Sequence, residues 1–140
     1  MKKVIIFFAC SLFTITTKAQ SVEKSELRMD TLIINRNDNR FFEAEYDLTS
    51  TLKFKEVSTI LDSSKTVSIG LTFNEGSGAM LKIYNPFSDK LVYKAELYSY
   101  KKKDYLETST VPIFSKLSSF EIWPYKIDRI RLTGFMLTKQ

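Results

Sequence analysis

The chain contains no histidine, and its only cysteine is Cys10. Zinc sites usually need His or Cys ligands, and nucleophilic triads need a His base. Both kinds of site are therefore excluded if the N-terminal segment that contains Cys10 is cleaved off. The chain also has only four glycines, and none of them forms a glycine-rich phosphate-binding loop. We therefore expect no metal, no cofactor and no catalytic residue, and predict that the chain is not an enzyme.

The chain carries little excess positive charge once residues 1–19 are removed. The formal net charge of +5 includes Lys2, Lys3 and Lys18, while residues 1–19 hold no acidic residue, so removing them lowers the charge to +2. Domains that bind nucleic acid usually carry a clustered basic face on a clearly cationic chain. We therefore expect no nucleic-acid partner.

The amino terminus has the pattern of a secretory signal peptide, residues 1–19. The mostly apolar run Val4–Phe13 follows two lysines and is too short to anchor the chain in a bilayer. Small residues, Thr17 and Ala19, then stand at positions −3 and −1 of a cut before Gln20. The chain is therefore expected to be exported, either to the periplasm or to the cell surface or medium, without stable membrane insertion after cleavage.

Cys10 offers an alternative way of processing this segment, as the lipidated residue of a lipoprotein. The bulky pair Phe7 and Phe8 stands just before it, where a lipoprotein signal carries small or aliphatic residues, and the remaining apolar run would be very short. We therefore interpret Cys10 as an ordinary apolar residue of the signal peptide.

The rest of the chain divides into a flexible lead-in, residues 20–30, and a single domain, residues 31–140. Period-2 alternation of apolar residues indicates short, half-buried strands; Val67, Ile69 and Leu71, for example, share one face. Clusters of turn-forming residues separate these runs about every 8–12 residues. The expected strands are residues 31–34, 41–48, 66–73, 79–84, 91–100, 108–113, 119–123 and 127–137.

Three details refine this pattern. Pro112 interrupts the strand expected at 108–113, which is typical of a sheet edge because proline cannot donate to a ladder. Gly134 is predicted to form a β-bulge that shifts the buried phase before Phe135. Residues 54–61 fit either one face of a short helix or a strand followed by a loop.

Together these features predict an all-β fold, an antiparallel β-sandwich with about seven to nine short strands. The first choice of topology is immunoglobulin-like, without the cysteine pair of antibody domains. The segment at residues 54–61 leaves room for one short helix.

Two groups of aromatic residues are candidates for a ligand or partner surface. The first is a loop in which tyrosines flank lysines: Tyr98, Tyr100, Lys101, Lys102, Lys103 and Tyr105. The second is Trp123 with Tyr125, separated by a proline. Both could stack on sugars or meet a protein, because Tyr and Trp are enriched at interfaces. The alternatives are a charged hairpin that keeps an edge soluble and a tryptophan that anchors the core.

Two patterns of oxygen ligands are weaker candidates. Glu43, Glu45 and Asp47 share a strand face, which is compatible with the paired acids of a hydrolase, but any solvent-facing strand shows this alternation. Residues 35–39 carry Asn and Asp at alternating positions, loosely like a calcium loop, without its terminal bidentate acid. We interpret the first as a solvated face and the second as a turn.

The C-terminal part, from about Leu81 onward, resembles small exported proteins of the Bacteroidota that have no known activity. The similarity is carried by a Thr-Ser…Pro segment, residues 108–112, by the Ser-x-Glu-x-Trp-Pro pattern at residues 119–124, and by the final apolar strand. This resemblance implies export and a β-sandwich, and it assigns no functional residues.

The sequence thus favours an exported, non-enzymatic β-sandwich module that binds an envelope protein or glycan, with its oligomeric state open. A carbohydrate-binding module that uses surface aromatics is the alternative, and a secreted carboxylate-dependent hydrolase is a weaker one. Exposed coplanar aromatic rings would favour the carbohydrate, an apolar patch a protein partner, and two acids facing each other in a cleft the hydrolase.

Overall fold

A computed structural model of the chain describes residues 29–46 and 51–139, of which residue 46 is described by its backbone alone. These residues form nine strands and no helix. The strands are β1 (Leu32–Asn35), β2 (Asn39–Tyr46), β3 (Leu52–Val57), β4 (Thr66–Asn74), β5 (Gly78–Tyr84), β6 (Lys90–Ser99), β7 (Asp104–Thr108), β8 (Ser118–Trp123) and β9 (Arg129–Thr138). The predicted signal peptide, with Cys10, and most of the lead-in lie outside the described residues.

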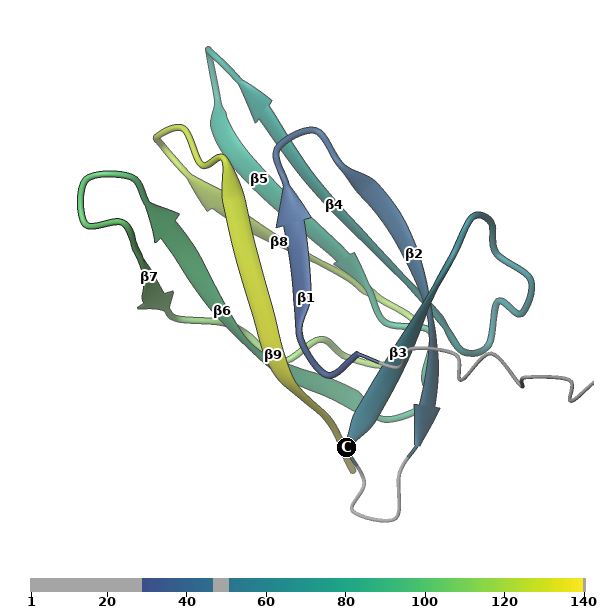
Figure 1. The fold of residues 1–140 in the computed structure, drawn as a ribbon. Coiled ribbons are helices and arrows are strands. Elements are labelled where there is room, and N and C mark those ends of the chain that lie inside the picture. Colours follow the sequence, from purple (N-terminus) through teal and green to yellow (C-terminus); the bar gives the residue numbers. More distant parts are fainter. Residues whose placement is uncertain (1–28, 47–50, 140) are drawn as a thin grey trace, which may run out of the picture.

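The strands make two packed antiparallel sheets, so the predicted β-sandwich is confirmed (Figure 1). One sheet has the order β1-β9-β6-β7, and the other has the order β3-β2-β4-β5-β8. The immunoglobulin-like topology is not confirmed, because the last strand lies in the middle of its sheet, whereas the immunoglobulin order CFG places it at an edge. Figure 1 shows the β1–β2, β4–β5, β6–β7 and β8–β9 connections gathered at one end of the sandwich.

The core lies between the sheets and is built from the alternate residues that the sequence pattern selected. In β4 the buried apolar side chains are Val67, Ile69 and Leu71, and in β5 they include Leu81 and Ile83. A chain of aromatic contacts then crosses from one sheet to the other. Its members are Phe42, Phe54, Phe135 and Tyr93, with centroid distances of 6.3, 4.8 and 5.9 Å between successive rings.

The predicted bulge at Gly134 is confirmed. The register between β6 and β9 pairs Val92 with Met136 but Lys94 with Thr133, so β9 carries one extra residue at this point. Gly134 has a φ of 61°, a left-handed conformation that glycine adopts without the steric cost of a side chain. The bulge changes the phase of β9, so that Phe135 is buried after Ile130 and Leu132.

One expected strand was placed wrongly, and the structure decides the one segment that the sequence left open between helix and strand. The strand expected at 108–113 lies at 104–108 instead, because the chain reverses immediately after β6, with Lys103 at a φ of 55°, and pairs Ser99 with Asp104. The open segment at residues 54–61 is strand β3 followed by a connection, and no helix forms there. Pairing with β2 and burial of Phe54 account for the strand.

The end of the predicted lead-in touches the sandwich. Met29 pairs with Phe54 through two backbone hydrogen bonds of 2.8 Å, one in each direction, and so covers part of the free edge of β3. Within the described part of the chain, no helix is long and apolar enough to span a membrane.

Candidate functional site

The first predicted group, around the lysine-rich turn, forms the tip of the β6–β7 hairpin. Tyr98 and Tyr105 are cross-strand partners, and their ring centroids lie 5.2 Å apart with an interplanar angle of 65°. The ring of Tyr100 stands at 90° to that of Tyr98, at 4.9 Å. Tyr100 and the three lysines that follow it are exposed. The hairpin therefore presents edge-to-face rings, not a flat aromatic platform.

Arginines from β9 support this tyrosine cluster. The Arg131 guanidinium lies 4.0 Å from the ring centroid of Tyr105, and that of Arg129 lies 5.7 Å from the ring of Tyr98. Arg131 also donates two hydrogen bonds, of 2.6 and 2.8 Å, to the carboxylate of Glu96. These bonds lower the pKa of Glu96 below its ordinary value, so this carboxylate stays ionised and holds the arginine against the hairpin.

Tyr125, which the sequence grouped with Trp123, lies beside the tyrosines of the hairpin. A groove of about 490 Å³ is lined by Tyr98, Tyr100 and Lys101 from the hairpin and by Tyr125 from the β8–β9 connection. Leu106 of β7 lies in the same groove. Lys102, Lys103 and Tyr105 do not line it, so only some of the predicted residues share a single site.

Trp123 must be removed from the candidate surface. Its side chain is only 8% exposed and belongs to the core, as the alternative interpretation had it. The reason is its phase in β8: Trp123 pairs with the buried Ala79, whereas Ile122 pairs with Met80 on the opposite face. The ring therefore points between the sheets.

Sequence reasoning found only Tyr100 and Tyr125 of the main group of exposed apolar and aromatic side chains among the described residues. We call this the β7–β8 surface; its eight members are large, exposed and apolar or aromatic, and all fall within residues 100–125. They are Tyr100, Leu106, Val111, Phe114, Leu117, Phe120, Ile122 and Tyr125. Only three other large apolar side chains among the described residues are comparably exposed: Ile60, Leu61 and Met136. The alternation of residues in β8 could have revealed part of the β7–β8 surface, because Phe120 and Ile122 lie on the face of the strand opposite to Trp123.

The β7–β8 surface contains a second groove, of about 280 Å³, beside β8. Residues 111–114 and 117–121 line it, which places Val111, Phe114, Leu117 and Phe120 around one hollow. The β7–β8 connection therefore does not cover these side chains but adds to the exposed apolar area.

Buried Asn85 holds this connection in place. Its side-chain amide nitrogen donates to the carbonyl oxygens of Asp89, Ile113 and Phe114 at 2.9, 2.9 and 3.1 Å. Its amide oxygen accepts a hydrogen bond from the backbone of Phe87. Buried polar groups must be satisfied in this way, and the result is a connection fixed with Ile113 buried and Phe114 exposed.

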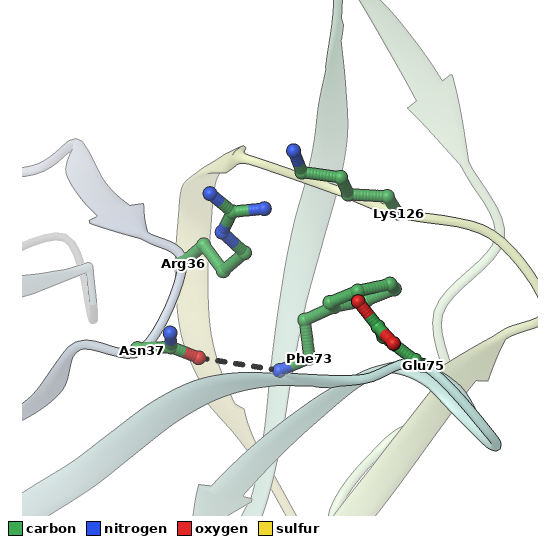
Figure 2. A pocket seen from close by; sticks show the side chains of 5 residues that line it. All are labelled: Arg36, Asn37, Phe73, Glu75 and Lys126. Atoms are coloured by element: carbon green, nitrogen blue, oxygen red, sulfur yellow. Dashed lines mark hydrogen bonds between the residues drawn. The ribbon is translucent and has the colours of Figure 1, made fainter.

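A polar hollow of about 590 Å³ lies at the loop end of the sandwich (Figure 2). Figure 2 shows Arg36 and Lys126 on one side of it, with Phe73 and Glu75 on the other. Both cations already share Asp128, at 3.1 Å from Arg36 and 3.7 Å from Lys126. The charges that face this hollow are thus largely compensated by the protein itself.

The weak calcium candidate at residues 35–39 is a turn, as interpreted. Asp38 accepts hydrogen bonds from the backbone and side-chain nitrogens of Asn35, and Asn37 has a φ of 65°. Across residues 29–46 and 51–139, no group of three or more His, Cys, Asp or Glu side chains gathers as metal ligands would.

The first acid of the hydrolase alternative is engaged in an ion pair. Glu43 lies 2.8 Å from the ammonium group of Lys65, and Asp47 lies outside the described residues. Glu96 and Glu107 are cross-strand partners, but Arg131 keeps Glu96 ionised. A general acid needs a raised pKa so that it holds a proton, and the lowered pKa of Glu96 is the opposite.

Comparisons with known proteins add no relative. No protein-family model, no curated protein and no solved structure matches the chain.

Proposed function

We propose that this chain is an exported, non-enzymatic module that binds a protein of the cell envelope through the β7–β8 surface. The observation that carries the proposal is the concentration of exposed apolar side chains there: eight of the eleven found among the described residues lie within residues 100–125. Groups of exposed apolar side chains usually mark interaction sites. Export follows from the signal-peptide pattern at residues 1–19.

The composition of the surface favours a protein over a glycan. Phenylalanine, leucine, isoleucine and valine predominate around the groove beside β8, and protein interfaces have apolar cores of this kind. The tyrosines of the hairpin meet edge to face, at 65° and 90°, so they do not offer the coplanar rings on which a sugar chain stacks. Trp123, the residue best suited to such stacking, is buried.

Carbohydrate binding is the second candidate function, and one observation favours it. Tyr100 and Tyr125 are 61% and 55% exposed and line the same groove, next to Lys101. Two separated tyrosines could contact successive rings of a sugar chain. The same experiment distinguishes the two functions.

The test is site-specific photo-crosslinking with the full chain expressed in its native host. A photoreactive phenylalanine analogue at position 120 is expected to yield a discrete protein adduct. The matched control carries the analogue at position 61, because Leu61 is equally apolar and 76% exposed but lies in the β3–β4 connection. No adduct at position 120, or the same adducts at both positions, would contradict a protein-binding β7–β8 surface.

A binding assay with soluble envelope polysaccharide completes the test. We expect no retention of the protein on immobilised polysaccharide. Retention that is lost in the double variant Tyr100→Ala/Tyr125→Ala, and kept in Ile60→Ala/Leu61→Ala, would replace the proposal with carbohydrate binding.

A further inference from the structure

The two sheets end in four edge strands, and within the described residues β8 is the edge with the fewest features that protect it from pairing. Edge strands are usually protected by charge, by shortness or by a covering segment. β1 has only four residues, and Met29 pairs with β3. β7 begins beside three lysines and carries Asp104 and Glu107. β8 has six residues, Ser-Ser-Phe-Glu-Ile-Trp, without lysine, arginine or proline.

The far side of β8 has no strand neighbour within the described part of the chain, where β5 is its single partner. Its inward side chains are engaged: Glu121 accepts hydrogen bonds from the hydroxyl of Tyr93 and the backbone of Val111. Its outward side chains, Phe120 and Ile122, are 55% and 64% exposed. β8 thus combines a free edge with apolar side chains on an open face, the combination that invites another strand.

Lysines lie beside the exposed phenylalanine rings and add a charge preference: Lys82 of β5 shares the outer face with Phe120, and Lys90 begins β6. The ammonium group of Lys82 lies 5.7 Å from the ring centroid of Phe120, and that of Lys90 lies 5.8 Å from the ring of Phe114. No salt bridge among the described residues involves either lysine. A segment that covers the two phenylalanine rings therefore meets positive charge at its margin, and acidic side chains complement it.

We infer that an extended, acidic segment of a partner protein binds by adding a strand to the free edge of β8. Its backbone pairs with Ser118–Trp123, and the side chains on its outer face include both apolar residues, beside Phe120 and Ile122, and acidic residues, which complement Lys82 and Lys90. Main-chain hydrogen bonds supply affinity in this mode of recognition, and the alternating side chains supply specificity. The inference rests on the proposed function, in that it specifies how a protein partner occupies the β7–β8 surface.

The test uses a capped synthetic peptide in which valine and glutamate take turns at every second position, with threonine between them, so that one face of the strand carries both. The readouts are amide chemical shifts and hydrogen exchange of the protein. We expect shift changes and slowed exchange centred on residues 118–123. A peptide that is N-methylated at every residue loses the donors of both edges, so its affinity should fall by about tenfold or more. A peptide with lysine in place of glutamate should also bind more weakly, and this difference should shrink in high salt.

A protein variant gives the matched control. Ile122→Lys places charge on the open edge and should abolish peptide binding, whereas Leu61→Lys makes the same change on an exposed side chain elsewhere and should leave it intact. Failure of the valine–glutamate peptide to perturb residues 118–123, or equal affinity of the N-methylated peptide, overturns strand addition. Concentration-dependent protection of β8 in the free protein, with a dimer in sedimentation, overturns it in favour of a second copy of the chain.

These outcomes are separable from failure of the proposed function. If the photoreactive analogue at position 120 captures a protein while the peptides do not bind through their backbone, the β7–β8 surface remains a protein-binding site and strand addition is wrong. If neither experiment succeeds, both proposals fall.

Discussion

The backbone of Gly78 lies against the carbonyl oxygen of Trp123: a Cβ atom at position 78 would come within 2.1 Å of that oxygen. Gly78 also has a φ of 83°, a conformation that residues with a side chain rarely adopt. Glycine at this position therefore allows β5 to begin directly beside the end of β8, with Trp123 packed in the core.

Replacing Gly78 tests whether its close approach to the carbonyl oxygen of Trp123 matters for stability. Gly78→Ala should lower the free energy of unfolding by about 1–3 kcal/mol, because the new methyl group meets backbone and the conformation is strained. The control is Gly76→Ala in the same turn, where a Cβ atom would meet only Asn74 at 3.7 Å. Urea denaturation followed by circular dichroism compares the two, and equal midpoints would show that the close approach has no energetic consequence.

Trp123 should behave as a core residue. Trp123→Ala is expected to cost about 3–5 kcal/mol, since truncating a buried aromatic side chain leaves a cavity. Tyr125→Ala, two residues further along and 55% exposed, should stay within about 0.5 kcal/mol of the unmodified protein. Because Trp123 is the only tryptophan, its fluorescence should also be blue-shifted and poorly quenched by iodide. Red, readily quenched emission would contradict its burial.

Tyr93 should make stability depend on alkaline pH. Burial is the main cause that raises the pKa of its hydroxyl to about 12, while the ordinary tyrosine value is about 10. A group with a raised folded-state pKa stabilises the fold fully below the unfolded-state pKa and loses this contribution as pH rises through the folded-state value. We therefore expect stability to fall between about pH 10 and 12.

The variant Tyr93→Phe checks this assignment. It should flatten the fall in unfolding free energy over that pH range, whereas Tyr100→Phe, whose side chain is exposed, should not. Denaturant melts at a series of alkaline pH values provide the measurement. An unchanged slope in Tyr93→Phe would assign the alkaline transition to other groups.

Processing of the amino terminus is a prediction from the sequence alone. The exported protein should begin at Gln20 and carry no lipid, because Thr17 and Ala19 suit signal peptidase and the residues before Cys10 do not suit lipidation. The intact mass of the protein recovered from the envelope or the medium decides this. A diacylglyceryl adduct on Cys10 would overturn the prediction.

The sequence by itself determined which face of most strands is buried, because strand periodicity depends only on neighbouring residues. Alternation predicted the burial of Val67, Ile69 and Leu71, and the single Gly134 predicted the change of phase in β9. The sequence also predicts part of the tyrosine hairpin, because a short charged turn between two tyrosine-containing segments places Tyr98 near Tyr105.

Only the tertiary structure decided what depends on residues distant in sequence. The sequence pattern left Trp123 open between core and surface, and pairing of β8 with β5 turned its ring inward and Phe120 outward. Tyr125 joins the groove of Tyr100 only because the β8–β9 connection lies beside the β6–β7 hairpin. The strand order and the free edge of β8 follow from which strands pair, and local periodicity carries no information about pairing partners.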